Sequence, residues 1–424
     1  MKHKPNRLLC VLLAALVLLV AVAPAVSAAD AGIGGGAAAS APADTKTDVK
    51  AGTEDQEEEK TSVFSDLGVE DGSLGLPCKS AILMEATTGA VIYTQNAEES
   101  MPPASVTKVM TLLLLMEAID AGVIHLDDTV TVSANAASMG GSQVFLKEGE
   151  QMKLEDLLKS VVIASANDAA VALAEYLYGS VQAFVGKMNE RARALGMTGT
   201  SFENVTGLDD TAEHHVTSAR DIAIMSRELV AHKTILQYSS IWMDTIRDGA
   251  FGLTNTNRLV RFYPGCTGLK TGSTSKAGFC ISVTAEREGF SLICVIMGAE
   301  SRDVRNAAAV SLLDWGFANY GLFTAPGGTG VTVPVTGGIK DTCALTYAAF
   351  SAVLPKSKIS SVEQKIMKPE ALGAPIRKGD AVGSVAYTVD GETVGQVPLT
   401  AAEDVRKIGF FDILGRVLAR FLLV

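Results

Sequence analysis

The sequence predicts a mixed α/β (α+β) fold with a central antiparallel sheet flanked by helices, followed by a small all-β domain. Three observations predict it: strand-like pairs lie at both ends of the larger region, apolar helix-like runs lie between them, and short alternating segments follow residue 325. With 424 residues and 48% hydrophobic composition, the chain can bury two cores. We place the larger domain at 63–325 and the smaller one at 327–402.

Two pairs of short apolar segments predict the strands of the larger domain. Ser80–Glu85 and Gly89–Gln95 form the first pair, joined by a Thr-Thr-Gly turn. Phe279–Ala285 and Phe290–Met297 form the second pair, around a turn at residues 286–289. These hairpins are the basis of the expected antiparallel sheet.

Longer helix-like runs predict the helices of the larger domain. In chain order these are Ser105–Ile119, which follows Pro102-Pro103, Leu154–Ile163, Ala169–Tyr178, Ala183–Leu195 and the closing helix Val310–Asn319.

The smaller domain begins where the composition changes, at Ala325-Pro326-Gly327-Gly328. Beyond this point Ala381–Val389 and Thr393–Leu399 alternate between apolar and polar residues, which is typical of strands. Asp390-Gly391 between them is a strong hairpin signal. We therefore expect an all-β domain here.

The N-terminus has the three parts of a secretory signal peptide, which we place at 1–28. Basic residues at 2–7 precede the apolar run Leu8–Val22, and Val26-Ser27-Ala28 supplies small residues for cleavage. The alternative is an uncleaved membrane anchor, although the apolar run is short for a span. In either case the rest of the chain is expected outside the cytoplasm, held at the outer face of the cell membrane.

Residues 29–62 are rich in Ala, Gly, Asp, Thr and Glu and contain no aromatic side chain, so we expect a disordered acidic linker. The net charge of −11 argues against a nucleic-acid partner. The chain has neither Cys-x-x-Cys nor His-Glu-x-x-His, so we expect no metal and no cofactor. Five cysteines remain after the predicted cleavage, and Cys280 and Cys294 lie in apolar strand-like runs that favour a core position.

The tail, residues 403–424, is expected to form an amphipathic helix. Asp412, Arg416 and Arg420 recur every four residues and so share one helical face, while most of the other residues are apolar. The segment is too short and too charged to span a bilayer, and an orientation within the membrane interface fits better. The alternative is a terminal helix docked on its own protein.

The first chemical signal is Ser105-Val106-Thr107-Lys108. Positions i and i+3 share a helix face, so Lys108 can reach the Ser105 hydroxyl, and the helix start favours developing negative charge. A serine nucleophile needs an adjacent base, and a buried lysine near another cation loses pKa and can be that base. Ser273-Thr274-Ser275-Lys276 has the same pattern but reads as a turn without a helix, so we expect Ser105 to react.

A second signal, Ser165-Ala166-Asn167, lies in the break between two apolar helices. There Ser165 can relay a proton between Lys108 and a leaving group, and Asn167 can hold a substrate amide. The alternative for Ser165 is ordinary capping of the following helix. Ser133-Ala134-Asn135 has the same pattern, but it follows a short strand and is expected to cap a helix.

The third signal, Lys270-Thr271-Gly272, occurs once and is expected on a strand beside the second hairpin. Lysine supplies a cation and threonine a hydroxyl donor for a substrate carboxylate, and Gly272 lets a ligand approach the backbone. The alternative is a polar strand end.

In order and spacing, the three motifs resemble those of the penicillin-binding proteins and serine β-lactamases. Within that superfamily the chain is most similar to the low-molecular-mass D-alanyl-D-alanine carboxypeptidases, serine peptidases of the S11 type. The closer resemblance rests on the stretches Ser80–Glu85, Pro103–Lys108, Ala164–Ala170, Asn204–Leu208, Thr217–Asp221 and Gly268–Gly272. It implies a transpeptidase-like fold for 63–325.

The resemblance also implies a reaction and its partners. Ser105 would attack the carbonyl between the last two D-alanines of a peptidoglycan stem peptide, and Lys108 would accept its proton. Ser165 would pass a proton to the departing D-alanine, while Lys270 and Thr271 hold its carboxylate. β-Lactam antibiotics would act as covalent inhibitors.

The oxyanion hole of the family would consist of the backbone N–H groups of Ser105 and Ser273. Some family members carry histidine where this chain has Ser273, so the outer pocket is expected to differ.

Other readings remain open from the sequence. A class A β-lactamase needs a glutamate for deacylation. Glu203-Asn204 follows Ser165 at a suitable distance in the chain, but the Glu-x-x-Leu-Asn pattern of that family is absent. A DD-endopeptidase of the same superfamily, or an inactive cell-wall-binding module, are further alternatives. His214-His215 is expected in an exposed loop without a catalytic role.

Overall fold

The computed structural model describes residues 73–209 and 212–422. The predicted signal peptide and acidic linker therefore lie outside the described residues, and both stay predictions.

A five-stranded sheet forms the centre of the larger domain, with strand order β2-β1-β9-β8-β7. All of its neighbouring strands run antiparallel, which confirms the predicted fold class. Its strands are β1 (Ser80–Glu85), β2 (Val91–Gln95), β7 (Cys266–Thr274), β8 (Gly278–Arg287) and β9 (Phe290–Ala299). The strand that carries the third motif, β7, lies at one end of this order.

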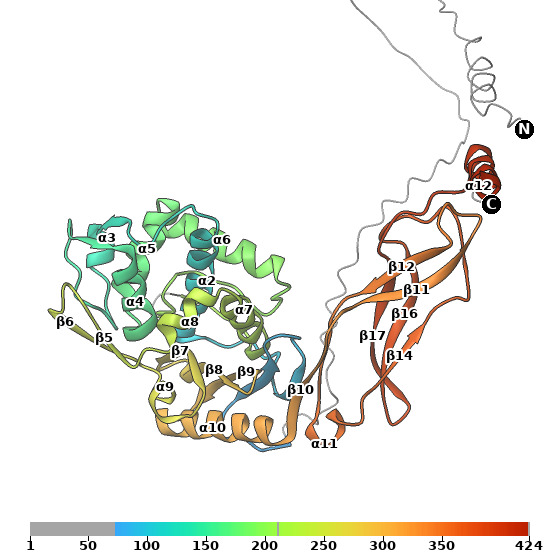
Figure 1. The fold of residues 1–424 in the computed structure, drawn as a ribbon. Coiled ribbons are helices and arrows are strands. Elements are labelled where there is room, and N and C mark those ends of the chain that lie inside the picture. Colours follow the sequence, from blue (N-terminus) through green and yellow to red (C-terminus); the bar gives the residue numbers. More distant parts are fainter. Residues whose placement is uncertain (1–72, 210–211, 423–424) are drawn as a thin grey trace, which may run out of the picture. The chain divides into compact units, whose positions relative to one another are not determined.

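Helices cover both faces of the sheet, because its side chains alternate between two cores (Figure 1). On β1, Ile82 and Met84 join the core shared with the helical region, whereas Ala81 and Leu83 join the core that contains α10. The helices are η1 (Ala104–Thr107, a 3₁₀ turn), α2 (Lys108–Asp120), α3 (Ala134–Ala137), α4 (Leu154–Ala164), α5 (Asn167–Tyr178), α6 (Val181–Ala194), α7 (Ala219–Ala231), α8 (Lys233–Ser239), α9 (Leu259–Phe262) and α10 (Arg302–Asn319).

Short strand pairs complete the larger domain: β3 (Thr129–Thr131) with β4 (Gln151–Lys153), and β5 (Met243–Ile246) with β6 (Phe251–Thr254).

Two of the longer helices differ clearly from the sequence prediction. The closing helix α10 begins at Arg302 rather than Val310, because Ser301 caps it by accepting the N–H of Val304. The prediction omitted α7, which Ser218 caps in the same way through the N–H of Asp221. In both cases a serine cap begins the helix ahead of its apolar stretch.

The smaller domain is built on a six-stranded sheet, with strand order β14-β16-β17-β12-β11-β15. The predicted hairpin is present, and Asp390 and Gly391 between its strands have positive φ angles of 52° and 84°. The strands are β11 (Gly328–Thr336), β12 (Thr342–Tyr347), β14 (Glu363–Met367), β15 (Leu372–Gly373), β16 (Ala381–Val389) and β17 (Glu392–Ala401). A separate pair joins β10 (Tyr320–Ala325) to β13 (Phe350–Pro355), which the short α11 (Lys356–Ile359) follows.

The tail helix is shorter than predicted. Val405 is fully buried in the core of the smaller domain and exchanges backbone hydrogen bonds with Ile376, so the chain at 403–405 still belongs to that domain. The helix α12 begins at Phe410, where the Asp412 carboxylate accepts the N–H of Gly409 at 2.9 Å. No helix among residues 73–209 and 212–422 is long and apolar enough to cross a membrane.

All five cysteines after the predicted cleavage point have free thiols. Cys280 and Cys294 are fully buried in the two cores, as the sequence predicted. Burial raises the pKa of the Cys280 thiol to about 11, so this side chain stays protonated.

Candidate active site

The first motif forms a tight turn at the start of a helix. Ser105 lies in η1, which we call the nucleophile turn (Ala104–Thr107), and Lys108 is the first residue of α2. The Lys108 ammonium donates to Ser105 Oγ at 3.0 Å. The predicted pairing of these two side chains is therefore present, with a 3₁₀ turn in place of regular helix at the serine.

Backbone crowding holds the nucleophile turn on two sides. A Cβ on Gly272 of β7 would lie 2.7 Å from the Ser105 nitrogen, and a Cβ on Gly207 would lie 1.8 Å from the Ala104 oxygen. Neither position has room for a side chain. Gly272 also lines the cavity, so the expected approach of a ligand to its backbone stays a prediction.

Lys108 is fully buried and uses all three ammonium hydrogens. Besides Ser105, it donates to Asn167 Oδ1 at 2.6 Å and to the Thr206 carbonyl at 2.9 Å. Burial lowers its pKa well below the ordinary value, the charge of Lys270 lowers it further, and Asp168 opposes the shift. This direction favours the neutral amine that a general base requires.

The two polar residues of the second motif have different roles: Ser165 lines the cavity, and Asn167 binds the Lys108 ammonium. Ser165 lies between α4 and α5 in a left-handed conformation with φ of 62°, and it lines the same cavity as Ser105. The N-cap of α5 is Ala166, and this helix has no side-chain cap, so the capping alternative for Ser165 is wrong. Asn167 does not line the cavity, and its oxygen accepts from Lys108. Its contact with a substrate amide stays a prediction.

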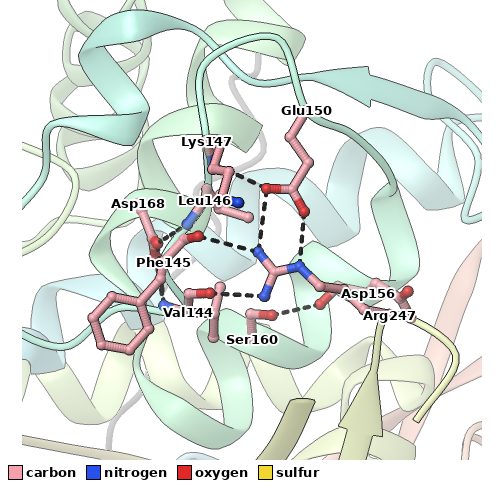
Figure 2. Close-up of polar contacts among 9 residues, drawn as sticks. All are labelled: Val144, Phe145, Leu146, Lys147, Glu150, Asp156, Ser160, Asp168 and Arg247. Atoms are coloured by element: carbon pink, nitrogen blue, oxygen red, sulfur yellow. Dashed lines mark hydrogen bonds and ion pairs between the residues drawn. The ribbon is translucent and has the colours of Figure 1, made fainter. Parts of the chain in front are cut away.

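The segment 140–150 packs against the second motif and is held from two sides (Figure 2). Asp168 accepts the N–H groups of Val144 and Leu146, the latter at 3.0 Å. From the opposite side Arg247, between β5 and β6, donates to the Val144 carbonyl at 2.9 Å and pairs with Glu150 at 2.7 Å. These contacts fix the segment that carries Ser142, another residue of the cavity wall.

The third motif divides between the cavity and the core. Thr271 and Ser273 line the cavity, and Thr271 Oγ1 donates to Thr256 Oγ1 at 2.8 Å. Lys270 is fully buried, and its ammonium donates to the Thr271 carbonyl at 2.7 Å. Burial and the charge of Arg305 lower the pKa of Lys270 to about 7. Its cationic form is therefore only partly populated at neutral pH in the free protein.

The cavity has a volume of about 620 Å³ and contains cations that the sequence reasoning missed: Arg258, Arg302 and Arg305. Arg305 is nearly buried and donates to the Cys280 carbonyl at 3.3 Å. Burial lowers its pKa to about 10, so it remains charged at neutral pH. Arg302 and Arg305 are three residues apart at the start of α10 and so share one helical face. The sequence prediction began this helix at Val310 and therefore missed the pair.

A family model described as D-alanyl-D-alanine carboxypeptidase matches residues 70–301, and a model of the C-terminal domain of penicillin-binding protein 5 matches residues 324–407. The chain belongs to the D-alanyl-D-alanine carboxypeptidase family. The residues of all three motifs lie within the first of these matches.

Curated relatives and solved structures of this carboxypeptidase family match most of the chain. D-alanyl-D-alanine carboxypeptidase DacF of Bacillus subtilis is 41% identical over 358 residues, which are 82% of this chain and 91% of that protein. DacC of Escherichia coli is 36% identical over 78% of this chain and 84% of that protein.

Penicillin-binding protein 5 of Haemophilus influenzae has a TM-score of 0.71 and 31% identity, covering 78% of this chain and 98% of that one. Penicillin-binding protein D2 of Listeria monocytogenes, solved with ampicillin bound, has a TM-score of 0.53 and 32% identity over 57% of this chain and 99% of that one.

The second copies of two carboxypeptidase motifs have other surroundings than the first copies. Ser273 lies in β7 and lines the cavity, so only the end of its Ser-x-x-Lys pattern forms the predicted turn. Lys276 donates to the Asp209 carbonyl at 2.7 Å in the turn after β7. Ser133 caps α3 by accepting the N–H of Ala136 at 3.0 Å, and Ser133 and Asn135 both bind Glu175. Within the described ranges no cluster of three or more His, Cys, Asp or Glu side chains is placed to hold a metal ion.

The expectation for the histidine pair was wrong for one member. His214 is exposed, but only 3% of the His215 surface is accessible, and its ring contacts Thr107 of the nucleophile turn. The sequence could not predict this contact, because Thr107 and His215 are 108 positions apart in the chain.

Proposed function

We propose that this chain is a serine-type D-alanyl-D-alanine carboxypeptidase that removes the terminal D-alanine from peptidoglycan stem pentapeptides through an acyl-enzyme on Ser105. The observation that carries the proposal is the buried Lys108 amine 3.0 Å from Ser105 Oγ, at the edge of a cavity that also holds Ser165 and Thr271.

In the acylation step, neutral Lys108 accepts the hydroxyl proton while Ser105 Oγ attacks the carbonyl between the two D-alanines. A bond forms from Oγ to this carbon, and the bond to the D-alanine nitrogen breaks. Ser165 passes the proton to the departing amine. The N–H groups of Ser105 and Ser273 stabilise the oxyanion, and water later hydrolyses the ester.

The terminal carboxylate of the substrate accepts a hydrogen bond from the Thr271 hydroxyl, which turns away from Thr256 to donate it. The carboxylate also lies in the field of the Lys270 and Arg305 charges. Arg305 adds a charge that does not depend on pH near neutrality, whereas Lys270 loses its charge as the pH rises through about 7. Bringing a carboxylate beside Lys270 favours its protonated form. This arrangement selects peptides with a free C-terminal carboxylate.

The proposed activity is tested with a stem pentapeptide and with a cross-linked muropeptide dimer. We expect release of free D-alanine from the pentapeptide and a much slower cleavage of the dimer. Cleavage of the dimer at a comparable rate would make the chain a DD-endopeptidase instead, and cleavage of neither would contradict both enzymatic readings.

The same cavity is expected to take β-lactams, which acylate Ser105 and are released slowly. A class A β-lactamase is not favoured, because Glu203 does not line the cavity and its carboxylate accepts the N–H of His214 at 3.2 Å. Incubation with penicillin distinguishes the two enzymes, because rapid turnover of the antibiotic would contradict the carboxypeptidase.

We further propose that α12 (Phe410–Leu422) lies in the outer interface of the cell membrane and holds the mature enzyme there. Its apolar side chains are strongly exposed, with Phe411 at 83% and Phe421 at 78%. The exposed rings can enter the apolar part of a lipid interface, while Arg416 and Arg420 on the same helix attract anionic headgroups. The proposed secretion signal at 1–28 would place this helix on the outer side.

Replacing both Phe411 and Phe421 with serine is expected to weaken binding of the mature chain to anionic phospholipid vesicles at least tenfold, since each buried phenylalanine contributes roughly 1.5–3 kcal/mol. Phe145→Ser serves as the matched control, because Phe145 is 63% exposed in the larger domain. Equal vesicle binding by the double variant and the control, measured by co-sedimentation, would mean that α12 does not bind the membrane.

A further inference from the structure

A buried histidine connects the loop behind the site to the nucleophile turn. The N–H of Glu203 donates to His215 Nδ1 at 3.0 Å, and Nε2 lies 2.7 Å from Thr107 Oγ1. Because Nδ1 accepts a hydrogen bond, the proton of the neutral ring is on Nε2, which donates to Thr107. The Thr107 hydroxyl in turn donates to the Ala104 carbonyl at 2.8 Å.

This series of hydrogen bonds has one direction, from the Glu203 N–H through His215 and Thr107 to Ala104. It depends on a neutral ring with a single tautomer. Burial lowers the pKa of His215 to about 4 against the opposing charges of Glu203 and Asp209, so the ring is neutral at physiological pH. Phe202 packs against the ring with 5.7 Å between centroids and helps to hold its orientation.

The end of the series is a strained position. Ala104 has a φ of 49°, a left-handed conformation that non-glycine residues rarely adopt, and it directly precedes Ser105. Such a backbone persists only where its surroundings hold it, and strain of this kind gathers at active sites. The Ala104 carbonyl is held by the Thr107 hydroxyl and by close contact with Gly207.

We propose that His215 is a positioning residue for the nucleophile: by donating to Thr107 it holds the nucleophile turn in the conformation in which Ser105 Oγ faces Lys108. The inference deepens the proposed carboxypeptidase reaction and depends on it. His215 touches neither the cavity nor Lys108, so it acts only through Thr107 and Ala104.

Two isosteric variants separate the two ring nitrogens. His215→Gln retains a donor near the position of Nε2, and His215→Asn retains an acceptor near Nδ1 but loses the donor to Thr107. We expect His215→Asn to lower the second-order rate of acylation by a fluorescent penicillin about 100-fold, because a small misplacement of a reacting atom has effects of this size. His215→Gln is expected to restore most of that rate.

His214→Asn is the matched control, since its exposed side chain is the chain neighbour of His215, and it should acylate at the wild-type rate. The melting temperature is measured for every variant. If Asn and Gln at position 215 lower the acylation rate equally, or if the rate follows the melting temperature alone, the role is structural and the proposal is wrong.

The other end of the series gives an independent test in case the histidine variants fail to fold. Thr107→Val should lower acylation as His215→Asn does, whereas Thr107→Ser should not. The double variant His215→Asn/Thr107→Val should be no slower than either single variant, because both break one series. Additive losses would overturn the proposal. A wild-type protein that takes up no penicillin would instead contradict the proposed function.

Discussion

The Ser105→Ala variant is expected to form no covalent adduct with a fluorescent penicillin and to release no D-alanine from a stem pentapeptide. Ser105 Oγ is the hydroxyl to which the Lys108 amine donates, at 3.0 Å. Without this oxygen no ester can form, and removal of a nucleophile from such a catalytic unit lowers turnover by about 10⁴-fold or more. Gel fluorescence measures the adduct, and single-turnover assays measure the released D-alanine.

Ser133→Ala is the matched control for this prediction. Ser133 lies outside the cavity and caps α3, so its removal should reduce stability by about 1 kcal/mol and leave labelling intact. Labelling that survives in Ser105→Ala and disappears in Ser273→Ala would show that the second Ser-x-x-Lys pattern carries the nucleophile.

Replacing Lys108 with methionine or arginine is expected to slow acylation by about 10³–10⁴-fold at neutral pH, within the range of general-base effects. Methionine has no basic nitrogen, and arginine stays protonated at any pH at which the enzyme is folded. Stopped-flow measurement of acylation by penicillin gives the rate. A Lys108→Arg variant that acylates at the wild-type rate would exclude Lys108 as the base.

The pH dependence of the wild-type enzyme provides a second check on Lys108. Its pKa is lowered by burial and by Lys270, so the rate should fall only as the pH drops through this lowered value, where the amine becomes protonated. In the unfolded chain the lysine binds its proton up to its ordinary pKa of 10.5. The unfolded state therefore binds more protons, and the free energy of unfolding, relative to Lys108→Met, should rise with pH between the two values.

The sequence predicted the elements with strong local patterns. The hairpins at β1–β2, β8–β9 and β16–β17 carry turn residues between strand-like segments, and α2, α4 and α5 are long apolar runs. The omitted α7 and the first turns of α10 are instead begun by serine caps, at Ser218 and Ser301. There the capping residue and not the apolar run marks the helix start.

Motif spacing predicted the pairing of Ser105 with Lys108, because the two residues share one helical turn. It could not predict the cations in the cavity, since Arg258 and Arg305 lie outside the three motifs and far from Ser105 in the chain. It also could not predict that Gly272 packs against the backbone of the nucleophile turn. Such assignments depend on which surfaces face each other after folding.

By itself, then, the sequence determined the fold class, the three motifs and the order of their residues, because turn chemistry, periodicity and i, i+3 spacing act within a few residues. Only the tertiary structure decided the surroundings of these residues. Lys108 contacts Asn167 and Thr206 across 59 and 98 residues of chain, and Thr107 meets His215 across 108. That packing buries Lys108 and brings Lys270 near it, and both effects lower the pKa of Lys108. The spacing of the motifs along the chain shows neither the burial of a side chain nor the charges around it.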